Sequence, residues 1–132
     1  MKKKPVVCYL FTSFDKIDYI KNFKNNYLKF DAGVAHDLVI CFKLLSLNQI
    51  NIIKEELSDL KFYDFVDPHT KNDFDFGSYK RIAEIHLDKQ ILFLNSHSYP
   101  ICDNWLLKLL NYSDNNVLIG TSASNERGFY FI

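Results

Sequence analysis

The sequence has no excess of charge of either sign and no long apolar run. Its 16 basic residues are balanced by 16 acidic residues, which gives a formal net charge of zero at pH 7. A balanced chain lacks the electrostatic attraction that dominates nucleic-acid binding, so nucleic acid is not an expected partner. No stretch approaches the roughly 20 apolar residues that cross a bilayer, so no transmembrane segment is expected.

The sequence also has no paired cysteine motif and no complete signal peptide. The apolar run at 5–11, after three lysines, is too short for the apolar region of a signal peptide. The three cysteines, Cys8, Cys41 and Cys102, are odd in number and widely spaced. Reduced thiols in a cytoplasmic protein are therefore expected.

Several well-known catalytic motifs are missing as well. The chain contains no GxGxxG or GxxxxGK[ST] loop, no GxSxG elbow, no CxxC and no HExxH. These absences argue against a dinucleotide site of the usual kind, a P-loop, an α/β-hydrolase elbow and a classical zinc site.

Apolar strand-like runs alternate with amphipathic helical patterns through the whole chain. The length of 132 residues suits one domain, residues 1–132, with one core. Asp15 and Asp103 are predicted as helix caps, and Ser46 with Gln49 as a capping box. The predicted strands are 6–11, 38–42, 62–66, 91–94 and 117–119, and the predicted helices are 15–28, 46–60, 77–87 and 103–110.

This alternation predicts an α/β three-layer sandwich with a mainly parallel, Rossmann-like sheet. Right-handed crossovers place the loop after every strand on one edge, and ligands of open α/β sheets bind at that edge. The loops expected to converge there are 12–15, which starts at Thr12, 43–44, 67–69, 95–98 and 121–122, which starts at Thr121.

Of the four histidines, His97 is the best candidate for a functional role, because it follows a buried strand at this edge. His86 is expected on an inward helical face, and His69 in a surface loop. His36 lies far from the other three in sequence.

Three segments carry a resemblance to a known family. They are NDFDFGSYK at 72–80, FLNSH at 93–97 and NWLLKLL at 104–110. In this order they resemble glycosyltransferases of the GT-A fold, family 2-like, similar to rhamnan-synthesis-type proteins. The resemblance covers nearly all of the chain but only the nucleotide-sugar-binding half of such an enzyme, which indicates a truncated relative.

The resemblance implies transfer of a hexosyl or deoxyhexosyl group from a nucleoside-diphosphate sugar to a glycan acceptor in polysaccharide synthesis. Thr12 and Ser13 would line the nucleotide pocket, and Asp75 and Arg81 would lie near the base or the diphosphate. Asn95 would face the ribose, Ser96 would also bind the nucleotide sugar, and His97 would occupy the metal position, which in relatives serves Mn²⁺ or Mg²⁺. Such a protein would be cytoplasmic, or peripheral at the inner face of the membrane.

The chain departs from the family pattern at the metal motif. The usual DxD is Asn95-Ser96-His97, which brings no carboxylate, and a hard cation prefers carboxylate oxygens. Manganese bound with the help of His97, charge neutralisation by Lys80 or Arg81, and no donor binding at all remain open. Arg81 could also be a solvated helix charge.

Two further classes stay open beside the transferase. One is a non-catalytic GT-A-like binding or assembly module that forms a homodimer or binds a partner chain. The other is a flavodoxin-like or other nucleotide-binding α/β domain, which strand order would distinguish.

Overall fold

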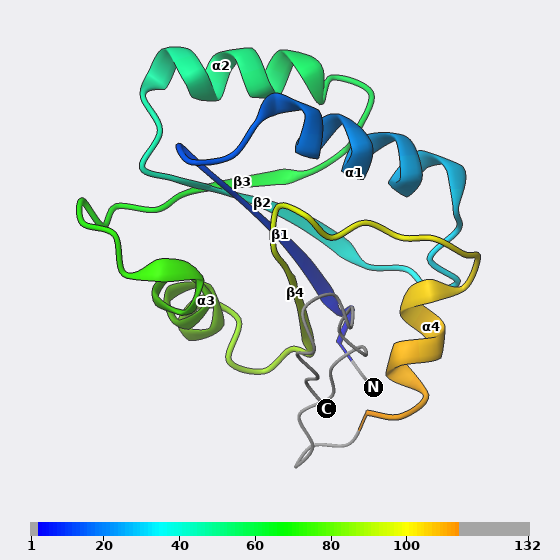
Figure 1. Cartoon of the computed structure of the whole chain (residues 1–132). Helices are drawn as coiled ribbons and strands as arrows, with labels where there is room; N and C mark the ends of the chain where they lie inside the picture. The colour runs from blue at the N-terminus through cyan, green and yellow to red at the C-terminus, as the bar shows by residue number, and fades with distance from the viewer. Residues whose placement is uncertain (1–2, 114–132) are drawn as a thin grey trace, which may run out of the picture.

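The computed structural model describes residues 3–113, which form a four-stranded sheet flanked by helices (Figure 1). The strands are β1 (Val6–Thr12), β2 (Asp37–Lys43), β3 (Tyr63–Val66) and β4 (Ile91–Leu94). The helices are α1 (Ile17–Lys29), α2 (Leu47–Glu56), α3 (Phe74–Ile85) and α4 (Trp105–Leu110). The strand predicted at 117–119 and the loop at Thr121 lie outside the described residues.

The four strands lie in the order β3-β2-β1-β4, and every neighbouring pair is parallel. The α/β class and the parallel, Rossmann-like three-layer sandwich are therefore confirmed. The order matches the first four strands of the doubly wound order 3-2-1-4-5-6. The flavodoxin-like alternative is wrong, because that order places β1 between β2 and β3.

Strand β1 lies inside the sheet and is buried on both faces, which explains its unbroken apolar sequence. Val7, Tyr9 and Phe11 point into one core, while Val6 and Cys8 point into the other. This alternation is the two-residue period of an extended strand.

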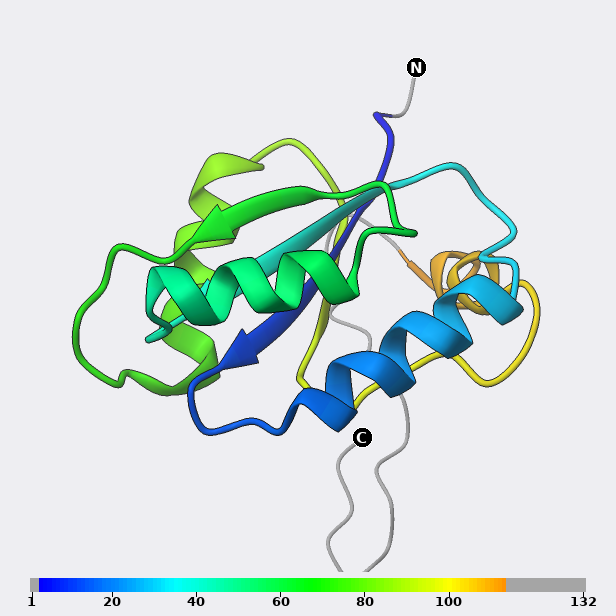
Figure 2. The ribbon, with the colours of Figure 1, turned by 90° about the horizontal axis from the view of Figure 1, so that it is seen from above.

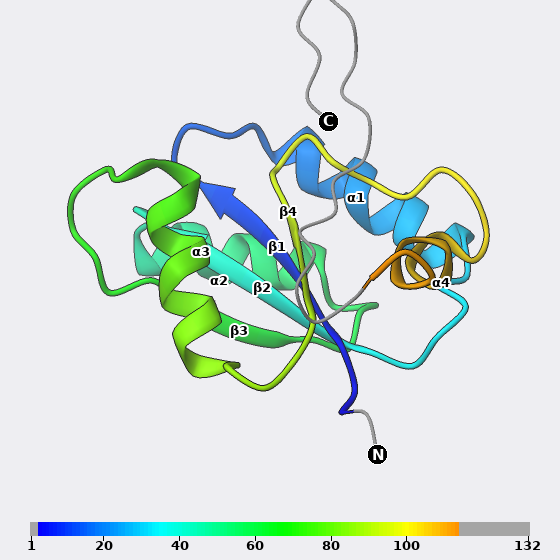
Figure 3. The same ribbon diagram turned by 90° about the horizontal axis from the view of Figure 1, so that it is seen from below.

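The two faces of the sheet carry different helices (Figures 1 and 2). Ile20 and Phe23 of α1, Ile50 and Ile53 of α2, and Trp105 of α4 belong to the larger core on one face. Figure 3 shows α3 across the opposite face, where Ile82 is its buried contribution. None of the helices in residues 3–113 is both long and apolar enough to cross a membrane.

The helix starts differ from the sequence prediction in three places. Asp15 and Asp103 do not cap their helices, since Lys16 and Asn104 hold those positions without a side-chain cap. Helix α3 begins at Phe74, three residues before the predicted start. The capping box of Ser46 and Gln49 is confirmed, with both reciprocal hydrogen bonds present.

Candidate functional site

A pocket of about 230 Å³ lies at the carboxyl edge of the sheet. Its walls come from the ends of β1, β2 and β4 and from the first turn of α3. The strand order reverses at this place: β2 and β3 are added on one side of β1, and β4 on the other. Ligands of open α/β sheets bind at such a switch point. The lining residues are Leu10, Thr12, Phe14, Asp15, Lys43, Leu44, Asn72, Phe74, Asp75, Asn95, Ser96 and His97.

Asp15 joins the two loops that meet at the switch point. One carboxylate oxygen accepts hydrogen bonds from the Thr12 backbone N–H (2.8 Å) and hydroxyl (2.9 Å). The other accepts one from the Ser96 hydroxyl (2.6 Å). Below it, the buried Tyr9 hydroxyl donates to the Ser96 carbonyl (2.6 Å). The loops after β1 and β4 are therefore held together by side chains as well as by the β-ladder.

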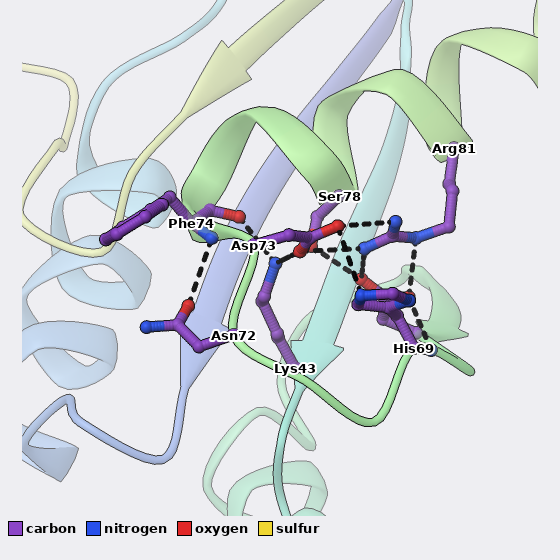
Figure 4. A network of polar contacts seen from close by, with 8 residues as sticks. Lys43, His69, Asn72, Asp73, Phe74, Ser78 and Arg81 are labelled. Carbon is purple, nitrogen blue, oxygen red and sulfur yellow. Dashed lines mark hydrogen bonds and ion pairs between the residues drawn. The ribbon is translucent and has the colours of Figure 1, made fainter.

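A buried cation lies on the other side of the pocket (Figure 4). Lys43, at the end of β2, is only 1% exposed. Its ammonium donates to the Asp73 carboxylate, the Phe74 carbonyl and the Ser78 hydroxyl. An ammonium in this position is stable only because all three partners are present.

Arg81 completes a charge-balanced network with Lys43. Its guanidinium donates to both carboxylate oxygens of Asp67, at 2.8 and 2.6 Å, and to Asp73 at 2.8 Å. Hydrogen bonds from Arg81 and then Lys43 hold the pKa of Asp73 well below its usual range. Burial alone would raise the pKa of Asp67, but hydrogen bonds from Arg81 and Ser78 keep it low. Two cations and two anions thus cancel.

Asp75 has a different environment from these paired carboxylates. Burial and the charge of Asp15 raise the pKa of Asp75 against the opposing influence of Lys43 and His97. Asp15 and Asp75 are the two lining carboxylates outside the balanced network. The pocket is therefore lined by two carboxylates, and its lining lysine, Lys43, is already paired with Asp73. An anionic ligand would need an additional cation to offset this negative charge.

The structure brings five of the predicted site residues together: Thr12, Asp75, Asn95, Ser96 and His97 line the pocket. Ser13 is exposed beside it, and its backbone N–H donates to the backbone carbonyl of Lys43 (3.2 Å). Arg81 is not brought to the pocket, because Asp67 and Asp73 hold its guanidinium. It is not a solvated helix charge either.

A divalent cation fits this site only with oxygen ligands from a bound phosphate. Within residues 3–113 no group of three or more His, Cys, Asp or Glu side chains is placed to hold a metal. Magnesium sites commonly use one or two carboxylates plus substrate phosphates, and Asp75 offers such a carboxylate. The exposed ring of His97 packs on the Tyr19 ring, with centroids 4.3 Å apart.

The loops expected at the ligand edge contain Phe14, Asp15, Lys43 and Leu44, and all four line the pocket, although none of them was named as a ligand-binding residue. The pocket role of Phe74 was not predicted. Leu44 and Phe74 both adopt left-handed backbone conformations, with φ 59° each. A bulky residue in this region is an outlier, and such strain is concentrated at functional sites.

A larger hollow of about 890 Å³ lies at the opposite edge, beside Tyr27, His36 and Trp105. The indole N–H of Trp105 has no hydrogen-bond partner among the described residues. That nitrogen is also covered by protein, so a ligand in the hollow cannot reach it. The chemistry at the switch point makes the smaller pocket the better candidate.

No family model, no curated protein and no solved structure matches the chain. The class of the protein is therefore defined by its fold and pocket alone: it is a Rossmann-like α/β domain with a pocket at the switch point of the sheet.

Proposed function

We propose that the pocket binds a nucleoside-diphosphate sugar and that the protein is a glycosyltransferase-like domain of polysaccharide synthesis in the cytoplasm. The observation that carries this proposal is the position of the pocket at the switch point between β1 and β4. The sequence resemblance supports it, because five residues implied by that resemblance line the same pocket. A glycan would be the acceptor.

In this proposal each part of the pocket has a separate task. Asn95 and Ser96 bind ribose hydroxyls, and Asp75 would hold a divalent cation. Such a cation would neutralise charge on the diphosphate, a task that the Lys43 ammonium does not perform because it is already paired with Asp73. An acceptor hydroxyl attacks the anomeric carbon of the sugar, the nucleoside diphosphate leaves with the electrons of the broken C–O bond, and the hydroxyl proton is released to solvent.

Calorimetric titration with UDP-, GDP- and dTDP-sugars, with and without Mn²⁺, tests the proposal. We expect one of them to bind, and Mn²⁺ to strengthen that binding. Asp75→Asn should remove the Mn²⁺ effect, while Asp59→Asn, a change on the exposed surface of the chain, should not. Absence of binding by every sugar nucleotide at millimolar concentration would exclude this function.

A non-catalytic assembly module is the second candidate. Three exposed phenylalanines favour it: Phe14 (72%), Phe74 (74%) and Phe76 (82%). Phe14 and Phe74 line the pocket, and Phe76 is two residues from Phe74 in the sequence. A second copy or a partner chain would cover such side chains. Light scattering across a concentration series tests this candidate. A dimer that Phe76→Ala dissociates would support it, because Phe76 does not line the pocket.

A further inference from the structure

Phe74 combines three properties that rarely occur together. The residue is 74% exposed, its backbone has a φ of 59°, and it lines the pocket at the switch point. A left-handed conformation costs a residue with a Cβ on the order of 1–2 kcal/mol. An exposed phenylalanine offers no core packing that would compensate for this cost.

Two polar contacts hold the backbone of Phe74 in this conformation. The Asn72 side-chain oxygen accepts from the Phe74 N–H (3.0 Å), and the buried Lys43 ammonium donates to the Phe74 carbonyl. The Lys43 ammonium is itself fixed by Asp73 and Ser78. Figure 4 shows the Phe74 ring pointing away from this network, on the side opposite Arg81.

We propose that Phe74 is the platform on which the base of the bound nucleotide stacks, and that Lys43 is the residue that positions it. This inference rests on the proposed sugar-nucleotide function and names the subsite for the base. A rigid, exposed aromatic ring beside a polar pocket suits a flat aromatic ligand, because every base has a π-face. The restrained backbone keeps the ring in place before the ligand arrives, which lowers the ordering cost of binding.

The arrangement also gives a role to the buried charge of Lys43. A lysine whose charge is balanced by Asp73 contributes little net attraction to a phosphate. Its contact with the Phe74 carbonyl instead fixes the direction in which the Phe74 ring leaves the chain. Lys43 therefore acts through Phe74 and does not need to touch the ligand.

Calorimetry on the full chain with UDP, GDP, dTDP and inorganic pyrophosphate tests the platform. Phe74→Ala should weaken binding of the preferred nucleotide by about 10-fold, the scale of base stacking on one aromatic ring. Pyrophosphate has no base, so its affinity should not change. Phe76→Ala is the matched control, since Phe76 is at least as exposed on the same helix but does not line the pocket.

A second readout comes from fluorescence of a Phe74→Trp variant. The chain has a single natural tryptophan, Trp105, which is buried at the far edge of the sheet. Stacking of a base on a tryptophan at position 74 should quench its emission, whereas pyrophosphate should leave the emission unchanged. Wild-type protein, with Trp105 alone, provides the baseline.

Lys43→Met tests the positioning role. We expect the same loss of nucleotide affinity as in Phe74→Ala, and no further loss in the double variant, because the two residues act in series. If Lys43→Met does not fold, Phe74→Ala and Phe74→Trp still test whether the base stacks on the residue at position 74.

The outcomes separate the inference from the proposed function. If wild-type protein binds a nucleotide and Phe74→Ala binds it equally well, stacking of the base on Phe74 is excluded, while the proposed sugar-nucleotide function is unaffected. If wild-type protein binds none of the nucleotides, the function fails and the platform fails with it. Equal losses for the nucleotide and pyrophosphate would also contradict base stacking.

Discussion

Gly77 lies in the first turn of α3, directly over the Asp73 carboxylate. A Cβ added at Gly77 would overlap all three atoms of that carboxyl group. Asp73 cannot move away freely, because Lys43 and Arg81 both bind it. Gly77 is therefore required by the close approach of a charged group and not by its backbone angle.

We expect Gly77→Ala to destabilise the fold by about 2 kcal/mol, the scale of overpacking, although alanine is the better helix former. Urea denaturation measures this change. In an Asp73→Ala background the same substitution should become neutral or stabilising, because the overlap is gone. A stabilising effect of Gly77→Ala alone would contradict the observed packing.

The three cysteines should differ in reactivity. Cys8 and Cys41 are buried in the sheet, and burial raises the pKa of Cys41 to about 12 and that of Cys8 further. Cys102 is partly exposed. With a thiol reagent at pH 8, the folded protein should react at Cys102 alone and the urea-unfolded protein at all three thiols. Cys102→Ser should abolish the reaction of the folded protein.

Individual side-chain roles were the least predictable part of the molecule. The sequence places Asp15 at a helix start, yet the side chain binds Thr12 and Ser96. Arg81 has the spacing of an exposed helix residue, yet the carboxylates of Asp67 and Asp73 hold it. Ser96 and Asp67 come from other elements than the side chains they bind, so local patterns carry no information about these contacts.

At the scale of elements, the capping box at the start of α2 gives a direct test of local chemistry. Ser46→Ala removes the hydrogen bond from the Gln49 N–H (3.2 Å) and should cost about 1 kcal/mol of stability in urea denaturation. Ser58→Ala, an exposed position just after the same helix, is the control and should change stability by less than about 0.5 kcal/mol. Equal effects of the two substitutions would argue against the capping role.

The element boundaries show where local sequence information is sufficient. All four described strands were predicted to within a residue or so. For β1 and β2 the reason is that a strand buried on both faces is a continuous apolar run. The start of α3 was placed three residues late. The reason is Phe74, whose left-handed backbone depends on Lys43 from another strand.

At the scale of the whole molecule, the stability of the fold should depend on pH in the acid range because of one charge network. This network consists of Asp67, Asp73, Lys43 and Arg81. Both aspartates have pKa values lowered in the folded state. Their contribution is therefore complete above the unfolded pKa of about 4 and is lost as the pH falls through the lower folded values. We expect the urea midpoint to fall steeply below about pH 4.

Arg81→Met should flatten this pH dependence, because the two carboxylates lose the partner that lowers their pKa. Lys54→Met is the matched control. Lys54 forms an exposed pair with Asp64, which contributes little to stability. The same acid slope in wild-type protein and Arg81→Met would show that the network does not couple stability to pH.

The sheet edge that carries the site was predictable, but its exact membership was not. Parallel crossovers place all strand-to-helix loops at one edge whatever the strand order. Which loops face one another depends on β4 pairing with β1, a long-range contact that no local pattern encodes. The first rule placed Thr12, Phe14, Asn95 and Ser96 at this edge, whereas the position of Phe74 at the pocket needed the observed structure.

The pairing of β4 with β1 also has a kinetic consequence. The link from Tyr9 to Ser96 spans 87 positions of the chain, so it closes a long loop and raises the contact order. Strands β1, β2 and β3 can associate through shorter crossovers before β4 arrives. We therefore expect the pocket wall supplied by Asn95 and Ser96 to be completed late in folding, so that a chain emerging from the ribosome would form this pocket only after β1, β2 and β3 have associated.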